Sequence, residues 1–230
     1  MTTRNGGVSA TPYGSFNLAT HVGDDPACVL ANRELLNLYL ENAQCIQWLE
    51  QVHGTDVMVA DGSVTAADGS FTVSKDFVLA ILTADCLPVL FCNREGTKVG
   101  AAHAGWRGLS AGILENTFHA MGCDPQKILV WLGPAISAEN FEVGGEVLEC
   151  FIQSVHMSRH QKIKQCFSMV KDKPGYYLAD LYQLAIERLN ALGIEQIFGG
   201  EFCSWKQADQ FYSYRRNGTT GRMASLIYIS

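Results

Sequence analysis

Charged side chains are scarce in this sequence. Asp, Glu, Lys and Arg make up 17% of its 230 residues, whereas an average soluble protein carries about 25%. The formal net charge is -6. A broad nucleic-acid footprint needs a surplus of basic side chains, so the composition argues against nucleic acid as a partner. Hydrophobic residues make up 47%, and with so few charges this predicts a large buried core.

Long hydrophobic runs are also missing. The most apolar stretch, residues 77–92, is interrupted by Thr83, Asp85 and Pro88 and is too short to cross a bilayer. The first residues, MTTRNGGVSATPYG, lack the basic, then apolar, then small order of a secretion signal. We therefore expect no membrane partner and a cytoplasmic location.

Three familiar motifs are absent as well. No two cysteines form a CxxC pair, no HxH pair occurs, and the GxxxxGK[ST] pattern of a P-loop is missing. The eight cysteines are widely scattered, which is typical of reduced thiols in a chain without a secretion signal. They are Cys28, Cys45, Cys86, Cys92, Cys123, Cys150, Cys166 and Cys203.

No repeat, low-complexity tract or linker interrupts the chain, so we expect residues 1–230 to form a single domain. Predicted strands alternate with predicted helices, and hairpin-like spacing at both ends indicates mixed sheets. We therefore expect an α+β (mixed α/β) fold with helices packed outside the sheets. Strands are expected at 55–60, 77–82, 88–91, 99–102, 128–132, 194–198, 211–215 and 224–229. Helices are expected from Pro26, over 109–121 and 145–156, and from Asp180 to Gly193.

Three residues of metal-binding type follow or end apolar segments: His53 in EQVHGTD, Cys86 in TADCLP and His103 in AAHAGWRG. Functional side chains are often placed at such ends of rigid elements. Two imidazoles and a thiolate suit zinc, with a fourth position left open for water as in catalytic sites. This pattern predicts a metal site, provided that the fold brings the three together.

Spacing alone favours a simpler interpretation, in which Cys86 is one buried cysteine among eight and the histidines are unrelated. A third interpretation makes Cys86 a nucleophile and His103 its base, without a metal. The remaining histidines lie in polar or helical contexts and are expected at the surface or at caps. They are His21, His119, His156 and His160.

The C-terminal run FYSYRRNGTTGRMAS places Arg215, Arg216 and Arg222 around two glycines. Guanidinium groups on a glycine-bearing turn suit a phosphate or a carboxylate. A strand–turn–strand hairpin with solvated arginines explains the same run equally well. Arg107 is a stronger anion-binding candidate because it lies four residues after His103, and the adjacent Trp106 can stack on a flat base or simply pack.

Seven segments together resemble the YfiH, or laccase-domain, family, which is also described as multicopper polyphenol oxidase-like and as purine nucleoside phosphorylases. The segments are TRNGGVSATPYGSFNLATHVGDD, NREL, QVHGTDV, TADCLPVLF, AAHAGWRGL, LGPAIS and FYSYRRNGTTGRMAS. They occur in the family's order and cover nearly the whole chain. One departure is CSWKQADQ before the last motif, where many members carry a Cys-Thr variant, and a pocket difference is expected there.

The resemblance implies that His53, Cys86 and His103 are zinc ligands, and this reverses the preference from spacing. It also implies a layered α/β/β/α sandwich with mixed β-sheets. The implied activity is phosphorolysis of adenosine, inosine, guanosine and 5′-methylthioadenosine, with adenosine deamination as a side activity. Arg33, in NREL, is a substrate-binding candidate from the resemblance alone.

Phosphorolysis needs an anion site for phosphate, a flat pocket for the base and stabilisation of a ribosyl cation. The arginines, Trp106 and Asp85 suit these needs. The partners implied are a nucleoside and phosphate. The chain itself is expected to be a monomer or a weak dimer. The H-x-E…P-C-x-x-C signature of cytidine-type deaminases is missing, so any deamination must be organised differently.

Three alternatives stay open. Some members of the family are linked to peptidoglycan precursor editing, for which a Cys86–His103 pair suits acyl transfer. A copper-dependent polyphenol oxidase is disfavoured, because a multicopper enzyme needs several His-rich sites and the six histidines form no HxH motif. A zinc-stabilised nucleotide-binding module is the alternative without catalysis.

Overall fold

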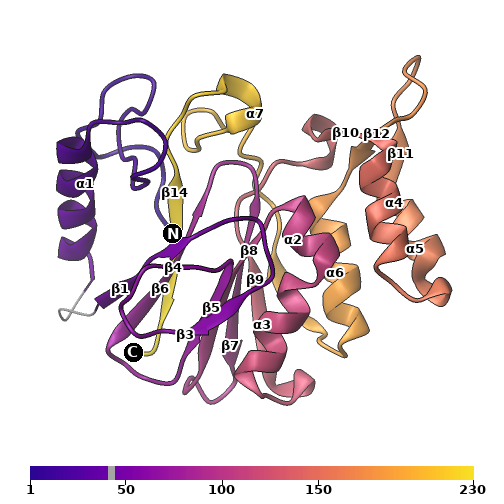
Figure 1. Cartoon of the computed structure of the whole chain (residues 1–230), viewed down its shortest axis with the longest axis horizontal. Coiled ribbons are helices and arrows are strands. Elements are labelled where there is room, and N and C mark those ends of the chain that lie inside the picture. Colours follow the sequence, from indigo (N-terminus) through magenta and orange to yellow (C-terminus); the bar gives the residue numbers. More distant parts are fainter. Residues whose placement is uncertain (41–44) are drawn as a thin grey trace.

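The centre of the molecule is a six-stranded mixed sheet (Figure 1). The computed structural model describes residues 1–40 and 45–230. The strand order is β13-β9-β7-β8-β5-β3, in which β13/β9 and β3/β5 pair in parallel and the other neighbours are antiparallel. The strands are β3 (Val57–Val59), β5 (Gly69–Thr72), β7 (Leu87–Asn93), β8 (Val99–Ala104), β9 (Ile128–Leu132) and β13 (Gln196–Gly199).

Smaller sheets accompany the central one. One contains β1 (Cys45–Gln47), β6 (Phe77–Thr83) and β14 (Met223–Tyr228), with β1 parallel and β14 antiparallel to β6. A second is built from β10 (Glu142–Gly144), β12 (Tyr176–Ala179) and β11 (Phe167–Met169). β2 (Leu49–Glu50) and β4 (Thr65–Ala66) form a short parallel pair.

Helices cover the outer faces of the two main sheets. α1 (Pro26–Leu38) lies beside β6 and β14, whereas α2 (Trp106–Ala111), α3 (Ile113–Met121) and α6 (Leu181–Ala191) lie beyond the central sheet (Figure 1). α4 (Gly145–Gln153), α5 (His160–Gln165) and the short α7 (Tyr214–Asn217) complete the α-helices of the described residues. Single 3-10 turns occur at Pro125–Lys127, Ala138–Asn140 and Met157–Arg159.

Three apolar clusters hold these layers together. Leu79 and Ile81 of β6 pack against Leu90 of β7 and Ala101 of β8, so the space between the two sheets is one core. A larger core joins the other face of the central sheet to α3 and α6, and a third joins β6 and β14 to α1. The order of layers is therefore α/β/β/α, which confirms the predicted fold class.

Local signals explain where several helices begin and end. Asp25 accepts a hydrogen bond from the N–H of Ala27 before α1, and Asp180 accepts one from Gln183 before α6, as the capping pattern predicts. The helix expected over 109–121 is two helices, α2 and α3. Gly112 separates them with a φ of 107°, a left-handed conformation that favours glycine.

The strand predicted over 211–215 is wrong. Phe211 and Tyr212 are buried against Ala84 and Met223, and Ser213 then caps α7 by accepting a hydrogen bond from the N–H of Arg216. The alternating aromatic and polar residues resemble a strand, but tertiary burial and a serine cap produce a loop and a helical turn instead. The hairpin interpretation of this run is wrong for the same reason. Within the described residues, no helix is long and apolar enough to cross a membrane.

Candidate metal centre and adjoining cavity

Cys86 and His103 are brought together by the antiparallel pairing of β7 and β8. Cys86 directly precedes β7, His103 lies near the end of β8, and the register pairs Pro88 with His103. Side chains alternate along a strand, so Cys86 shares a face with Leu90, and His103 shares one with Ala101. Because Leu90 and Ala101 both face the core between the two sheets, the side chains of Cys86 and His103 both lie at one edge of that core.

Cys86 also lies where the chain leaves one sheet for the other. β6 ends at Thr83, and Ala84 and Asp85 connect it to Cys86. Asp85 has a φ of 99° and is 9% exposed. Its carboxylate accepts hydrogen bonds of 2.6 Å from the Ser204 hydroxyl and from the backbone N–H of Arg215. Asp85 therefore fastens the crossover to the start of α7.

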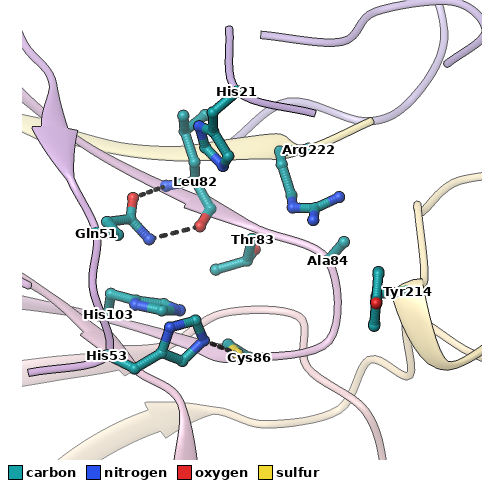
Figure 2. A pocket seen from close by; sticks show the side chains of 10 residues that line it. All are labelled: His21, Gln51, His53, Leu82, Thr83, Ala84, Cys86, His103, Tyr214 and Arg222. Atoms are coloured by element: carbon teal, nitrogen blue, oxygen red, sulfur yellow. Dashed lines mark hydrogen bonds between the residues drawn. The ribbon is translucent and has the colours of Figure 1, made fainter. Parts of the chain in front are cut away.

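His53 reaches the site from a loop between β2 and β3. Its φ of 61° is unusual for a residue other than glycine. Two residues earlier, the Gln51 amide donates to the carbonyl of Leu82 and accepts the N–H of Leu82, both at 2.8 Å (Figure 2). These bonds fasten the His53 loop to β6, close to the crossover that carries Cys86.

Asp68, which sequence reasoning missed, holds both the loop and the second imidazole. Its carboxylate is fully buried and accepts the backbone N–H groups of Val52, His53 and Gly54 at 3.2, 3.0 and 2.6 Å. Nδ1 of His103 lies 2.7 Å from the same carboxylate. The sequence offers little signal for this role, because an acidic residue before a glycine (Asp68-Gly69) is typical of an ordinary turn.

The three side chains form a compact group of donor atoms. Sγ of Cys86 lies 3.8 Å from Nε2 of His53, and the rings of His53 and His103 are 4.8 Å apart at 72°. One donor atom from each residue lies within 4.8 Å of the others. Donor atoms this close to one another would allow His53, Cys86 and His103 to hold one metal ion together. Among the described residues, this is the group of His, Cys, Asp and Glu placed to hold a metal ion.

The electrostatics favour the charged thiolate. Burial opposes ionisation of Cys86, but the charge of His103 and hydrogen bonds from His103 and His53 outweigh it and lower the thiol pKa to about 6. Burial likewise opposes protonation of His103, yet the Cys86 charge and the hydrogen bond to Asp68 raise its pKa to about 9. A thiolate beside imidazoles is the form that binds a metal or attacks an electrophile.

Two glycines in the AGWRG segment leave room for this packing. A Cβ atom added at Gly105 would lie 2.7 Å from the His53 ring and 3.1 Å from Sγ of Cys86. One added at Gly108 would lie 2.8 Å from the carbonyl oxygen of Gly54. The start of α2 therefore fits directly against the His53 loop only because these positions have no side chain.

A cavity of about 360 Å³ opens onto the metal-binding group. His21 and Arg222 lie across it from His53, Cys86 and His103 (Figure 2). The lining residues are His21, Gln51, His53, Leu82, Thr83, Ala84, Cys86, His103, Tyr214 and Arg222. His21 is exposed at the surface, as expected, and its side chain also lines this cavity.

Arg222 is the predicted anion-binding residue that lines the cavity. Arg107 is exposed and lies over the ring of its neighbour Trp106, at 4.4 Å. Arg33 lies over the ring of Trp48 at 4.0 Å and donates to the carbonyl of Leu18. These three residues, Trp106, Arg107 and Arg33, are not among the cavity's lining residues.

Arg215 and Arg216 fasten loops of the chain. Arg215 donates to the carbonyl of Glu142 at 2.8 Å. Arg216 donates to the carbonyls of Ser204, Trp205 and Phe211. Neither guanidinium group, nor the Asp85 carboxylate, is part of the cavity lining, so their roles in substrate binding stay predictions.

The family model for multi-copper polyphenol oxidoreductase laccase matches residues 1–230. The chain belongs to this laccase family. It is 51% identical over 230 residues to the purine nucleoside phosphorylase YfiH of Escherichia coli, covering 99% of this chain and 91% of that protein. It is 44% identical over 229 residues to the purine nucleoside phosphorylase of Haemophilus influenzae, covering 99% and 92%.

Solved structures of relatives have the same fold. A crystal structure of a Neisseria meningitidis protein matches with a TM-score of 0.93 and 45% identity, covering 100% of this chain and 93% of that one. The crystal structure of YlmD from Geobacillus stearothermophilus matches with a TM-score of 0.87 and 32% identity, covering 99% and 90%. The resemblance expected from the seven sequence segments is thereby confirmed for the family and the fold.

Proposed function

We propose that this member of the laccase family is a zinc-dependent purine nucleoside phosphorylase. The observation that carries the proposal is one cavity that joins a His–Cys–His metal-binding group to the guanidinium of Arg222. Its volume of about 360 Å³ lies in the range typical of small-molecule sites. The relatives named as purine nucleoside phosphorylases support the reaction class.

The donor set favours zinc over copper. Two imidazoles and a thiolate with an open fourth position are typical of catalytic zinc sites, and Asp68 supplies the carboxylate partner that commonly orients a zinc-bound histidine. When bound here, zinc supplies a Lewis acid facing the cavity. A multicopper oxidase would need further His-rich sites, and the described residues offer no second group of this kind.

The chain's own residues suit the remaining needs of phosphorolysis. Arg222 presents a guanidinium group that suits a phosphate. Tyr214 is 60% exposed and lines the cavity, so its ring is a better platform for a purine than Trp106, which packs against the helix-side core. We infer that adenosine, inosine, guanosine and 5′-methylthioadenosine are the substrates, with adenosine deamination as a side activity.

A second candidate function has one specific observation in its favour. Cys86, whose pKa is lowered to about 6, and the neighbouring His103, whose pKa is raised to about 9, form a thiolate–imidazolium pair, which suits acyl transfer in a hydrolase or amidase. The two proposals differ in what the thiolate does. In the phosphorylase it binds the metal, whereas in the hydrolase it is a free nucleophile that attacks the substrate and reacts with alkylating agents.

The deciding experiment combines metal analysis with a phosphate-dependent assay. Protein purified without added metal should contain about one zinc per chain, and inosine with phosphate should give hypoxanthine and ribose 1-phosphate. Cys86→Ala and His53→Ala should lose both metal and activity, whereas the exposed Cys150 provides a matched control as Cys150→Ala. Base release that is unchanged without phosphate would exclude phosphorolysis. Full activity in zinc-free protein would exclude the metal.

A further inference from the structure

A second cavity, of about 340 Å³, adjoins the first. His21, Tyr214 and Arg222 line both cavities. The first cavity continues to the metal-binding group, and the second continues to the segment Gly218–Thr220. These three side chains therefore border both cavities, and a ligand that extends from one cavity into the other lies beside them.

His21 and Arg222 are far apart in the sequence, but one buried amide holds both segments. Asn17 is fully buried. Its Oδ1 accepts the backbone N–H of Arg222 at 2.9 Å and that of Ala19 at 3.1 Å. Its Nδ2 donates to the carbonyl of Ala19 and to the carboxylate of Asp24. The segment that carries His21 is thus fixed relative to Arg222, as a site with two cooperating groups requires.

Arg222 keeps one edge of its guanidinium group available. Nη1 donates to the carbonyls of Thr220 and Gly221 at 2.8 and 3.0 Å. Within the described residues, Nε and Nη2 make no hydrogen bond to the protein, and the side chain lines both cavities. A guanidinium anchored at one nitrogen and open along an edge suits a bidentate oxyanion such as phosphate.

His21 is suited to exchange protons beside that anion. The His21 side chain is exposed, but partial desolvation by the surrounding protein and the nearby charges of Arg222 and Arg33 lower its pKa, with the charge of Glu50 opposing them. The imidazole is therefore neutral near pH 7, and a neutral imidazole has one nitrogen that donates and one that accepts. Figure 2 shows His21 and Arg222 on the wall of the cavity that faces the metal-binding group.

We propose that His21 relays a proton from hydrogen phosphate held at Arg222 to the departing purine, an inference that rests on the proposed function. A phosphate oxygen forms the bond to C1′ while the C1′–N9 bond breaks and its electron pair stays on the purine. The phosphate O–H proton passes to one nitrogen of His21, and the proton on its other nitrogen passes to the purine. Hydrogen phosphate and inosine then yield ribose 1-phosphate and neutral hypoxanthine, with protons and charge balanced.

The test compares two leaving groups in the metal-loaded protein. His21→Gln keeps hydrogen bonding but cannot relay a proton, and His21→Ala removes the ring. With inosine, both variants should lose about 10²- to 10⁴-fold in kcat, the usual contribution of acid–base catalysis. With 6-chloropurine riboside, whose purine leaves more readily as an anion, the loss should be smaller by about tenfold or more. Added imidazole should partly restore His21→Ala, because the side chain that it replaces is exposed.

His119→Ala is the matched control, since His119 is an exposed histidine on α3, away from both cavities. Thermal melting and zinc content verify that each variant is folded and loaded. Equal losses with both nucleosides would overturn the relay, and so would a kcat for His21→Ala close to that of the wild type. A wild-type protein that releases no base with phosphate overturns the proposed function itself, which this design reveals before any variant is made.

Discussion

Nδ1 of His103 lies 2.7 Å from Oδ1 of Asp68, and the same oxygen accepts the backbone N–H of His53. One buried carboxylate thus orients two candidate metal ligands that come from different segments of the chain. It leaves Nε2 of the His103 ring to face Cys86, to which His103 hydrogen-bonds, and it fixes the loop that carries His53. The metal-binding group is therefore arranged by a residue outside it.

Replacing Asp68 with Asn should weaken zinc binding by about ten- to a hundredfold, the usual effect of losing such an outer carboxylate. The amide nitrogen cannot accept the backbone N–H groups that Asp68 now binds, so the His53 loop also loosens. Competition with a chromogenic chelator measures the affinity. Asp172→Asn, at an exposed position, is the control, and equal zinc affinity in both variants would contradict the role of Asp68.

Gly105→Ala should remove the metal while leaving the fold intact. The φ of -64° and ψ of 154° at Gly105 are accessible to alanine, so the backbone is not strained. The added methyl group instead meets the His53 ring at 2.7 Å and Sγ of Cys86 at 3.1 Å. Zinc content and circular dichroism check this prediction. Gly145→Ala, whose added Cβ meets ordinary contacts of 3.4 Å or more, should retain zinc.

The pH dependence of alkylation should separate Cys86 from the other thiols. In metal-free protein its rate with iodoacetamide should rise with pH and reach half its maximum near pH 6, because deprotonation creates the reactive form and the pKa is lowered to about 6. His103→Gln should move this midpoint upward, since it removes the charge that favours the thiolate. Mass spectrometry of the Cys86 peptide gives the rates, with the exposed Cys150 as internal reference. A midpoint near pH 9 would show that His103 does not favour the thiolate.

Arg222→Lys should raise the apparent KM for phosphate by about ten- to a hundredfold, since one charged hydrogen bond contributes roughly 1.5–3 kcal/mol. Lysine keeps the charge but loses the planar edge, so the KM for inosine should change much less. Arg107→Lys is the control, because Arg107 is exposed and lies over Trp106, outside the cavity lining. Phosphate titrations that give the same KM in both variants would place the anion site elsewhere.

Much of the site could be predicted from short segments of sequence. Cys86 and His103 each lie at the junction of an apolar run with a turn, and strand alternation then decides which face each side chain enters. The helix caps at Asp25 and Asp180 are equally local, because the capping carboxylate binds an N–H only two or three residues away. Sequence patterns that extend over a few residues therefore predict the helices and strands and the positions of the candidate ligands along the chain.

The roles of the arginines, in contrast, are not predicted by such local patterns. Arg107, Arg216 and Arg222 all lie within two residues of a glycine. Of these three, only Arg222 lines the cavity, whereas Arg216 binds three loop carbonyls. Nothing local distinguishes them. A guanidinium group binds whichever acceptors the packed chain presents, so its role depends on segments that meet only after folding.

From the sequence alone, short-range periodicity predicted the alternation of strands and helices. The family and the three candidate metal ligands were predicted from the resemblance of seven segments to known family motifs. Tertiary structure alone decided that Asp68 orients His53 and His103, and that Asn17 holds the segments of His21 and Arg222 in one place. The contacts of Asp68 with His103 and of Asn17 with Arg222 join residues far apart in the chain. Their geometry is set by how the two sheets pack. The identity of a single polar residue does not indicate which distant residue it will hydrogen-bond to once it is buried.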